Sequence, residues 1–389
     1  MSAHASRGPS GSKIWMNCTG SPELIQSLEL PPEESSFAAE EGTFCHSVME
    51  LMVMESISGV VDNTPERAQE LRDLLDREAD KYDIDQMTKD LYELIDYLTD
   101  RRYQFPDLQI YLEQRVDLEP LTTEVWGTAD IILYSESSSY LEVIDLKYGR
   151  VFVDARNNSQ AMLYLIGAMM SILKVKRLPD MMQIAIYQPR AGGYPLRSTP
   201  VDQLSIEAFI TQLKEVLNGE KTLTAGEWCE YCDALLHCDV AKEKMKELME
   251  ITFDDLDKDV TVATEVLEFK KPLLKLVEKA EEVVKSTLSA GQPVAGWKLI
   301  AGTSRRQWAK DEDEIKEFLK KECKMKVGDM YKKTLIGIPA VEKIVKLRKN
   351  LDMEDLEPYI SKPPGKPTLA PESDSRPALS VNPFKDLGE

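Results

Sequence analysis

The sequence has no long hydrophobic run. Residues 1–15, MSAHASRGPSGSKIW, contain no apolar core of signal-peptide length. No later segment approaches the roughly 18 uninterrupted apolar residues of a membrane-spanning helix. We therefore expect an intracellular, cytoplasmic protein that has no membrane partner.

Basic charge is also scarce. The 389 residues include 48 Lys and Arg against 68 Asp and Glu, which gives a formal net charge of -20. This balance argues against a polycation that coats nucleic acid, because phosphate binding needs local positive charge. It does not exclude an enzyme with a confined basic groove. With 42% hydrophobic residues, the chain can supply the core of one large domain or of two ordinary ones.

Cysteines are few, and their spacing is uneven. In a reducing compartment, the six cysteines are expected to be free, buried or metal-binding. Three of them form a C-x2-C-x5-C cluster, and one stands far upstream after Trp15: Cys229, Cys232, Cys238 and Cys18. On spacing alone, zinc and an iron–sulfur cluster are comparable interpretations, with His237 as an alternative fourth zinc ligand. Three buried structural thiols are the simpler alternative.

The two remaining cysteines, Cys45 and Cys323, have no partners at ligand spacing. We expect ordinary buried or free thiols at both positions.

The hydrophobic pattern predicts an α/β fold with a mixed central β-sheet flanked by helices. Helical periodicity marks four stretches, at residues 36–58, 62–99, 157–175 and 205–218. Alternating or continuous apolar runs predict four strands, at residues 108–118, 125–134, 139–146 and 182–188. Residues 1–12 are expected to be a flexible lead-in, residues 13–250 the core, and residues 189–200 a loop.

An additional, mostly helical region is expected at residues 254–350. It includes a helix over 260–289 broken or kinked at Pro272, a strand at Trp297–Ile300, and helices at 311–322 and 338–347. Three lysines at helical spacing and a basic-aromatic patch could contact nucleic acid, although a solvated amphipathic helix and a surface loop are the simpler explanations: Lys271, Lys275, Lys279, Arg305, Arg306 and Trp308. Residues 361–389 are Pro/Ser/Gly-rich and are expected to be disordered.

The stretch from Glu124 to Tyr164 carries the strongest chemical pattern. Asp130 ends the motif G-T-A-D, and Asp145 and Lys147 stand in an apolar-flanked D-L-K. Side chains alternate along a strand, so the aspartate and the lysine of D-L-K point to the same side. Two carboxylates from neighbouring strands suit a hard divalent cation, which promotes phosphodiester hydrolysis by neutralising charge and activating water. The simpler alternative is strand-end aspartates and a solvated lysine.

This pattern resembles the PD-(D/E)xK nuclease superfamily, which has a restriction-endonuclease-like core. The branch with the RecB and AddB nuclease domains and the CRISPR-adaptation exonucleases is the most similar. The resemblance rests on residues in the family's order, namely His46, Asp130, Asp145, Lys147, Gln160 and Tyr164. It implies that the histidine and the two aspartates bind Mg²⁺ or Mn²⁺. It also implies that the lysine assists the nucleophile and that the Gln/Tyr pair contacts substrate or supports the site.

The same resemblance favours a [4Fe-4S] cluster over Zn²⁺. Iron–sulfur members of the branch use one cysteine before the nuclease core and three after it, as Cys18, Cys229, Cys232 and Cys238 would here. The implied function is a metal-dependent DNA nuclease, an exonuclease acting on single- or double-stranded ends. The layout also resembles phage and prophage proteins. It implies phage-type DNA processing or recombination in an infected bacterial host, with a recombination or single-strand-binding protein as a partner.

Two alternatives belong to other classes of protein. One is a non-catalytic DNA-binding or scaffold protein that retains the nuclease fold, and the other is a zinc-stabilised interaction module with incidental aspartates. The complete set of Asp130, Asp145 and Lys147 argues against both, because a binding-only protein has no need of a desolvated lysine beside two carboxylates.

Overall fold

The structure is a computed structural model that describes residues 7–30, 35–290, 292 and 294–297. The chain divides into two compact units, Met1–Glu282 and Val283–Glu389. The elements, in order, are η1 (Pro9–Gly11), α1 (Ser12–Trp15), α2 (Ser21–Ser27), α3 (Phe37–Ser56), α4 (Pro65–Glu78), α5 (Ile84–Gln104), β1 (Gln109–Leu118), β2 (Thr122–Ser135), β3 (Tyr140–Leu146), α6 (Ser159–Gly167), η2 (Ala168–Ile172), β4 (Met181–Tyr187), β5 (Leu196–Val201), α7 (Gln203–Asn218), η3 (Glu227–Tyr231), α8 (Asp239–Met249), α9 (Phe253–Lys258), α10 (Val260–Glu268) and α11 (Lys270–Ser289).

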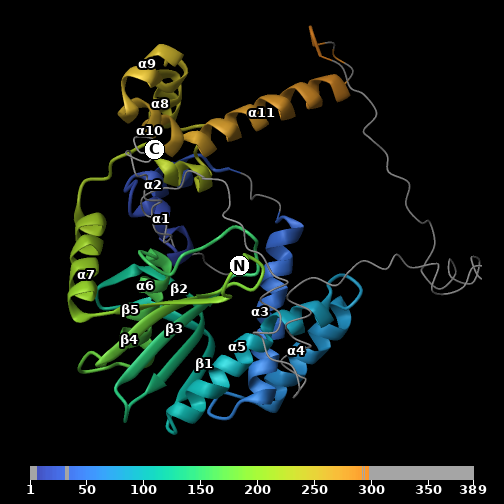
Figure 1. The fold of residues 1–389 in the computed structure, drawn as a ribbon, viewed down its shortest axis with the longest axis vertical. Coiled ribbons are helices and arrows are strands. Elements are labelled where there is room, and N and C mark those ends of the chain that lie inside the picture. Colours follow the sequence, from blue (N-terminus) through green and yellow to red (C-terminus); the bar gives the residue numbers. More distant parts are fainter. Residues whose placement is uncertain (1–6, 31–34, 291, 293, 298–389) are drawn as a thin grey trace, which may run out of the picture. The chain divides into compact units, whose positions relative to one another are not determined.

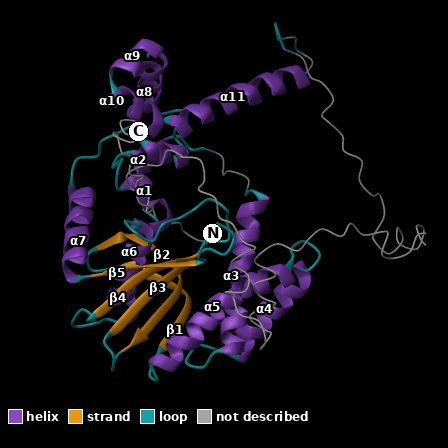
Figure 2. Ribbon diagram, viewed as in Figure 1, coloured by secondary structure: helices purple, strands orange, loops and turns teal. Residues whose placement is uncertain are grey.

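The centre of the first unit is one mixed five-stranded sheet in the order β1-β2-β3-β4-β5 (Figure 2). Strands β3 and β4 run parallel, and the other neighbouring pairs are antiparallel. Helix α6 and the π-helical turn η2 lie in the connection between the parallel strands, as a parallel pair requires. Strand β3 reads YLEVIDL and is buried along its whole length, as its apolar residues on both faces predict.

Two apolar layers cover the two faces of the sheet. One packs helices α3, α4 and α5 against side chains such as Ile131, Leu133 and Ile144 (Figure 1). The other packs α1, α6 and α7 against side chains such as Ile132 and Val143. The alternation of neighbouring residues between the layers is the period-2 pattern of the strands. The predicted α/β fold with a mixed central sheet, flanking helices and a helical C-terminal region is confirmed.

Strand β5 was not predicted, because the sequence favoured a loop over residues 189–200. The strand pairs antiparallel with β4 at the sheet edge and reads LRSTPV. Most of its residues are half-buried or exposed, so their side chains give no clear apolar alternation. Edge strands also tolerate a proline such as Pro200.

Other boundaries differ by a few residues, such as the helical stretch predicted to end at residue 99, which ends at Gln104. The long helix predicted at 157–175 is α6 followed by the π-helical turn η2, which ends at Ile172. The break predicted at Pro272 lies at Phe269, and Pro272 stands in the first turn of α11. A proline there removes no helical hydrogen bond, so it begins this helix and does not interrupt one.

The N-terminal segment is packed from Arg7 onward, where a flexible lead-in was expected. The Arg7 side chain is buried and forms ion pairs with Glu23 and Glu124. Trp15 Nε1 donates a hydrogen bond to the Gly8 carbonyl at 2.9 Å. These contacts fix residues 7–15 against strand β2 and helix α2.

Trp297 forms an isolated bridge with Val294, and Ile300 lies outside the described residues. The elements expected at 311–322, 338–347 and 361–389, together with Arg305, Arg306, Trp308 and Cys323, also lie outside them. Within the described part, no helix is long and apolar enough to cross a membrane.

Candidate metal centre

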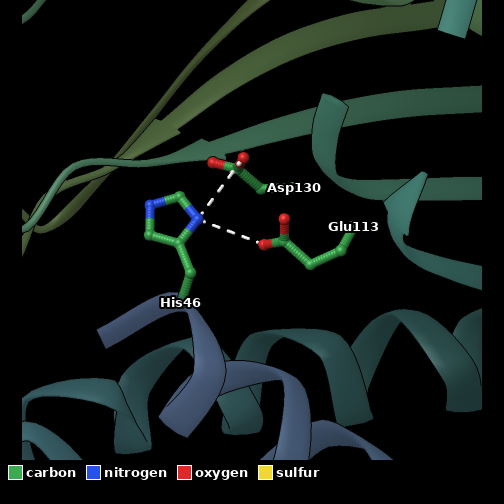
Figure 3. A group of neighbouring side chains, drawn as sticks. All are labelled: His46, Glu113 and Asp130. Carbon is green, nitrogen blue, oxygen red and sulfur yellow. Dashed lines mark hydrogen bonds and ion pairs between the residues drawn. The ribbon is translucent and has the colours of Figure 1, made fainter. Parts of the chain in front are cut away.

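Three side chains converge between helix α3 and the paired strands β1 and β2. His46 comes from α3, Glu113 from β1 and Asp130 from β2, and their ligand atoms all lie within 4.8 Å of one another. His46 Nδ1 lies 3.1 Å from Glu113 Oε1 and 3.5 Å from Asp130 Oδ1, as Figure 3 shows. One imidazole and two carboxylates at this spacing can hold a metal ion.

Asp130 is held in place by backbone and is nearly buried. Its side chain is only 9% exposed, and its Oδ2 accepts a hydrogen bond from the Leu146 amide at 2.6 Å. Burial raises the pKa of Asp130 to about 7; His46 opposes this shift, whereas the charges of Asp145 and Glu113 add to it. A carboxyl group buried among other carboxylates keeps its proton more readily, unless a cation beside it favours the charged form.

His46 responds to the same charges. Burial by itself would lower the pKa of the imidazole, but the hydrogen bond to Glu113 and the charges of Asp130, Glu113 and Asp145 raise it to about 9. Without a metal, this histidine therefore acts as a local counter-cation. A bound divalent ion would replace the proton as the positive charge of the cluster.

Asp145 and Lys147 lie beside this group, as the D-L-K motif predicted. Asp145 is 1% exposed, and Lys147 Nζ lies 3.1 Å from its Oδ1 and 2.9 Å from its Oδ2. The approach to Oδ2 lacks hydrogen-bonding geometry, so this buried oxygen has no hydrogen-bond partner. Burial raises the pKa of Asp145, while Lys147 and His46 counteract the shift and Glu113 adds to it.

The Gln/Tyr pair extends the same network from α6. Lys147 Nζ donates to Gln160 Oε1 at 3.3 Å, and Gln160 Nε2 donates to the Tyr164 hydroxyl at 3.3 Å. All six residues predicted for this site therefore gather around one point. Glu113, which the sequence did not single out, completes the compact group with His46 and Asp130, whereas Asp145 stands next to that group.

The glycine of G-T-A-D makes room for the site. A Cβ atom at Gly127 would lie 2.9 Å from Pro9 Cδ and 3.2 Å from Tyr164 Cε1. Because Gly127 has no side chain, the N-terminal segment and α6 can both approach β2 there. Gly127 lies three residues before Asp130 in the strand.

The four predicted cysteine ligands also come together. Cys18, Cys229, Cys232 and Cys238 line one cavity with apolar neighbours, and all four are free thiols. Cys18 Sγ accepts a hydrogen bond from the Thr224 amide at 3.4 Å, and Cys229 Sγ accepts one from the Gly226 amide at 3.5 Å. Peptide N–H groups directed at sulfur are a means by which proteins tune metal-bound thiolates.

The cysteine sulfurs affect one another electrostatically. Burial raises the pKa of Cys232 to about 11, and the charges of Cys229 and Cys18 contribute to the shift. Among the described residues, the groups with ligand atoms all within 4.8 Å of one another include no cysteine set. His237 is exposed and does not line the cavity.

Cys45 is a separate, fully buried thiol on α3, as expected for an ordinary core cysteine. Of the lysines considered for nucleic-acid contact, Lys271 pairs with Glu230 at 2.8 Å and Lys279 with Glu282 at 2.7 Å. These two ion pairs support the simpler interpretation of a solvated helix.

Two comparisons with known proteins bear on this chain. A family model described as "Protein of unknown function (DUF2800)" matches residues 4–377. A solved structure titled "Crystal structure of SSO0001" aligns with 59% of this chain and 96% of its own, at 12% identity and a TM-score of 0.23. A TM-score this low carries no argument about function.

Proposed function

The chain belongs to the DUF2800 family of proteins of unknown function, and from its own site we propose that it is a metal-dependent deoxyribonuclease degrading DNA from its ends. The observation that carries the proposal is the pair of buried carboxylates Asp130 and Asp145, close enough for the charge of Asp145 to raise the pKa of Asp130, with Lys147 held between Asp145 and Gln160. Buried carboxylates beside a lysine, with pKa values raised by burial, are characteristic of sites that do chemistry.

The donor set fits Mg²⁺ or Mn²⁺. Three carboxylates and one imidazole offer mainly hard oxygen ligands, which these ions prefer. The buried Oδ2 of Asp145 accepts no hydrogen bond, although it lies 2.9 Å from Lys147 Nζ, so it can still offer a lone pair to an ion. His46, Glu113, Asp130 and Asp145 would hold the metal. When bound, such an ion neutralises phosphate charge and lowers the pKa of water.

The protein groups would orient the reactants around that ion. The Leu146 amide fixes Asp130, and Asp145 and Gln160 fix the ammonium group of Lys147. Lys147 would donate a hydrogen bond to the attacking water or to a phosphate oxygen and stabilise the charge that develops there. Gln160 and Tyr164 would keep this lysine directed at the substrate.

We also propose that the four cysteines bind a [4Fe-4S] cluster. A tetrahedral zinc site with Zn–S bonds of about 2.3 Å brings its sulfurs to about 3.8 Å from one another. Thiolates that each bind a different iron stand farther apart, and no cysteine set among the described residues is as compact as zinc requires. The apolar cavity and the amide-to-sulfur hydrogen bonds support the same cofactor.

The test is degradation of linear single- and double-stranded DNA with Mn²⁺. Wild type should release nucleotides, and Asp145→Asn and Lys147→Ala should lower the rate by at least about 100-fold, the usual cost of losing one group that stabilises developing charge. Asp145→Asn keeps the size of the side chain and removes a buried charge, so loss of folding is not expected.

The exposed residues Asp100 and Lys89 on α5 supply matched controls. Asp100→Ala and Lys89→Ala should keep wild-type rates. Equal rates for wild type and both site variants would refute the catalytic proposal. DNA binding without cleavage would favour a non-catalytic DNA-binding or scaffold protein.

A further inference from the structure

The loop between β3 and α6 is shaped by a buried glutamine. Gln188 is 1% exposed, and its Nε2 donates to the carbonyls of Gly149 at 2.9 Å and Val151 at 2.7 Å. Its Oε1 accepts from the Val153 amide at 3.1 Å and from Arg197 at 2.8 Å. All hydrogen-bonding groups of this side chain thus hold one loop and one arginine, so residues 149–153 have a defined shape.

The tip of this loop presents apolar side chains to solvent. Val151 is 68% exposed and Phe152 is 47% exposed. The Arg197 guanidinium lies 4.5 Å from the centroid of the Phe152 ring. Scattered exposed apolar residues need no explanation, but here two adjacent ones stand on a loop that a buried side chain fixes. An arginine supports the aromatic ring, which remains about half exposed.

The loop is continuous with the candidate metal centre at both ends. It begins two residues after Lys147 and leads into α6, where Gln160 accepts from Lys147 Nζ at 3.3 Å. Its cations are Arg150, which is exposed, and Arg156, which lies 3.5 Å from Asp154. In a chain with a net charge of -20, arginines beside the site favour a polyanion there.

We propose that Phe152 is a stacking platform for a base of single-stranded DNA whose backbone passes the metal centre. This inference rests on the proposed nuclease function and names the form of its substrate. Every base has a π-face, so stacking on an aromatic ring holds single strands without selecting a sequence. Arg150 contacts the backbone phosphates, and Arg197 fixes the ring from behind.

The test separates base stacking from phosphate binding. A fluorescent oligothymidylate and an abasic strand of equal length are titrated with the full chain in Ca²⁺, and anisotropy reports binding. Wild type should bind the strand with bases about tenfold more tightly, since one stacked base contributes about 1–3 kcal/mol. Phe152→Ala should abolish this preference, Phe152→Trp should retain it, and thermal unfolding should show that both variants fold.

Phe253 on α9 is 87% exposed and supplies the matched control, so Phe253→Ala should keep the preference. Wild type that binds both strands equally, or Phe152→Ala that still prefers bases, would overturn the platform. The DNA degradation assay tests the nuclease proposal separately, so either proposal can be refuted without the other. A base preference that depends on Phe152 without any cleavage would reject the nuclease and leave a single-strand binding site.

Discussion

At the scale of single residues, the candidate metal centre has more negative charge than its own cations neutralise. Three carboxylates face only two cationic side chains: Glu113, Asp130 and Asp145 against His46 and Lys147. Burial raises the pKa of both aspartates. Burying ionised carboxylates costs several kcal/mol each unless opposite charge accompanies them. The site therefore gains most from a divalent cation, and metal binding should be linked to folding stability.

That linkage gives a prediction for Glu113. Mn²⁺ at about 100 times its dissociation constant should stabilise wild type by about 2.7 kcal/mol and raise its Tm. Glu113→Gln removes one charged ligand from the group with His46 and Asp130, so the Mn²⁺-dependent rise in Tm should shrink. Differential scanning calorimetry with and without Mn²⁺ measures both effects.

The exposed Glu136 supplies the matching control, because Glu136→Gln changes the net charge by the same amount outside the site. Its Tm should rise with Mn²⁺ as in wild type. If Glu113→Gln keeps the full response, Glu113 is no ligand.

Sequence reasoning found the other members of this site and missed Glu113 for a physical reason. Asp145 and Lys147 stand at the end of the apolar-rich stretch Leu141–Leu146, and Asp130 directly precedes the apolar run Ile131–Tyr134, so these charged groups stand out. Glu113 lies among the polar residues of an alternating strand, where solvent exposure is the ordinary expectation. Its backbone φ of 48° departs from strand geometry, and its side chain lies against His46 and Asp130. This backbone irregularity at Glu113 depends on how β1 packs with β2 and α3, and a local sequence pattern does not encode that packing.

At the scale of elements, the apolar pattern predicted β1 to β4 and most helices, since burial sets their periodicity. Strand β5 escaped because hydrogen bonds to β4, rather than apolar alternation, define it. The packed segment before α1 escaped because small polar residues such as Gly8 and Ser10 are also typical of flexible ends. The ion pair of Arg7 with the distant Glu124 and the hydrogen bond from Trp15 to the Gly8 carbonyl hold this segment in place.

The contact of η1, β2 and α6 at Gly127 gives an element-scale prediction. Gly127→Ala would place a methyl group 2.9 Å from Pro9 Cδ and 3.2 Å from Tyr164 Cε1. Overpacking of this kind costs about 1–3 kcal/mol, so urea unfolding should show that loss in the free energy of unfolding.

Because Tyr164 bonds Gln160, which bonds Lys147, the same change should also slow DNA degradation. Gly192, where a Cβ atom would meet nothing within 4 Å, is no fair control because its φ is 79°. Gly42 on α3 is the better one, since a Cβ atom there also has open space, and Gly42→Ala should be neutral or stabilising. Unchanged stability of Gly127→Ala would show that the neighbouring elements separate freely.

At the scale of the whole molecule, the four cysteines join distant parts of the first unit. The Thr224 amide that bonds Cys18 Sγ is 206 residues away in the chain, and the Gly20 amide bonds the Thr222 carbonyl at 2.9 Å. The proposed cluster, held by Cys18 and the three later cysteines, would close a loop that contains the whole sheet. Closing a long loop destabilises the unfolded chain, and the chain-entropy model gives about 5 kcal/mol for loops of about 100–200 residues.

Cys18→Ser should therefore remove the cofactor and the clamp together. Wild type purified without oxygen should be brown with broad visible absorption, and the variant should lose the colour and several kcal/mol of unfolding free energy. Cys45→Ala is the control: this buried thiol on α3 does not line the cysteine cavity, so its loss lowers stability but keeps the absorption. If wild type is colourless and contains zinc, the iron–sulfur proposal is wrong and the four cysteines form a zinc site. The proposal for the carboxylate site would be unaffected, because none of its ligands is a cysteine.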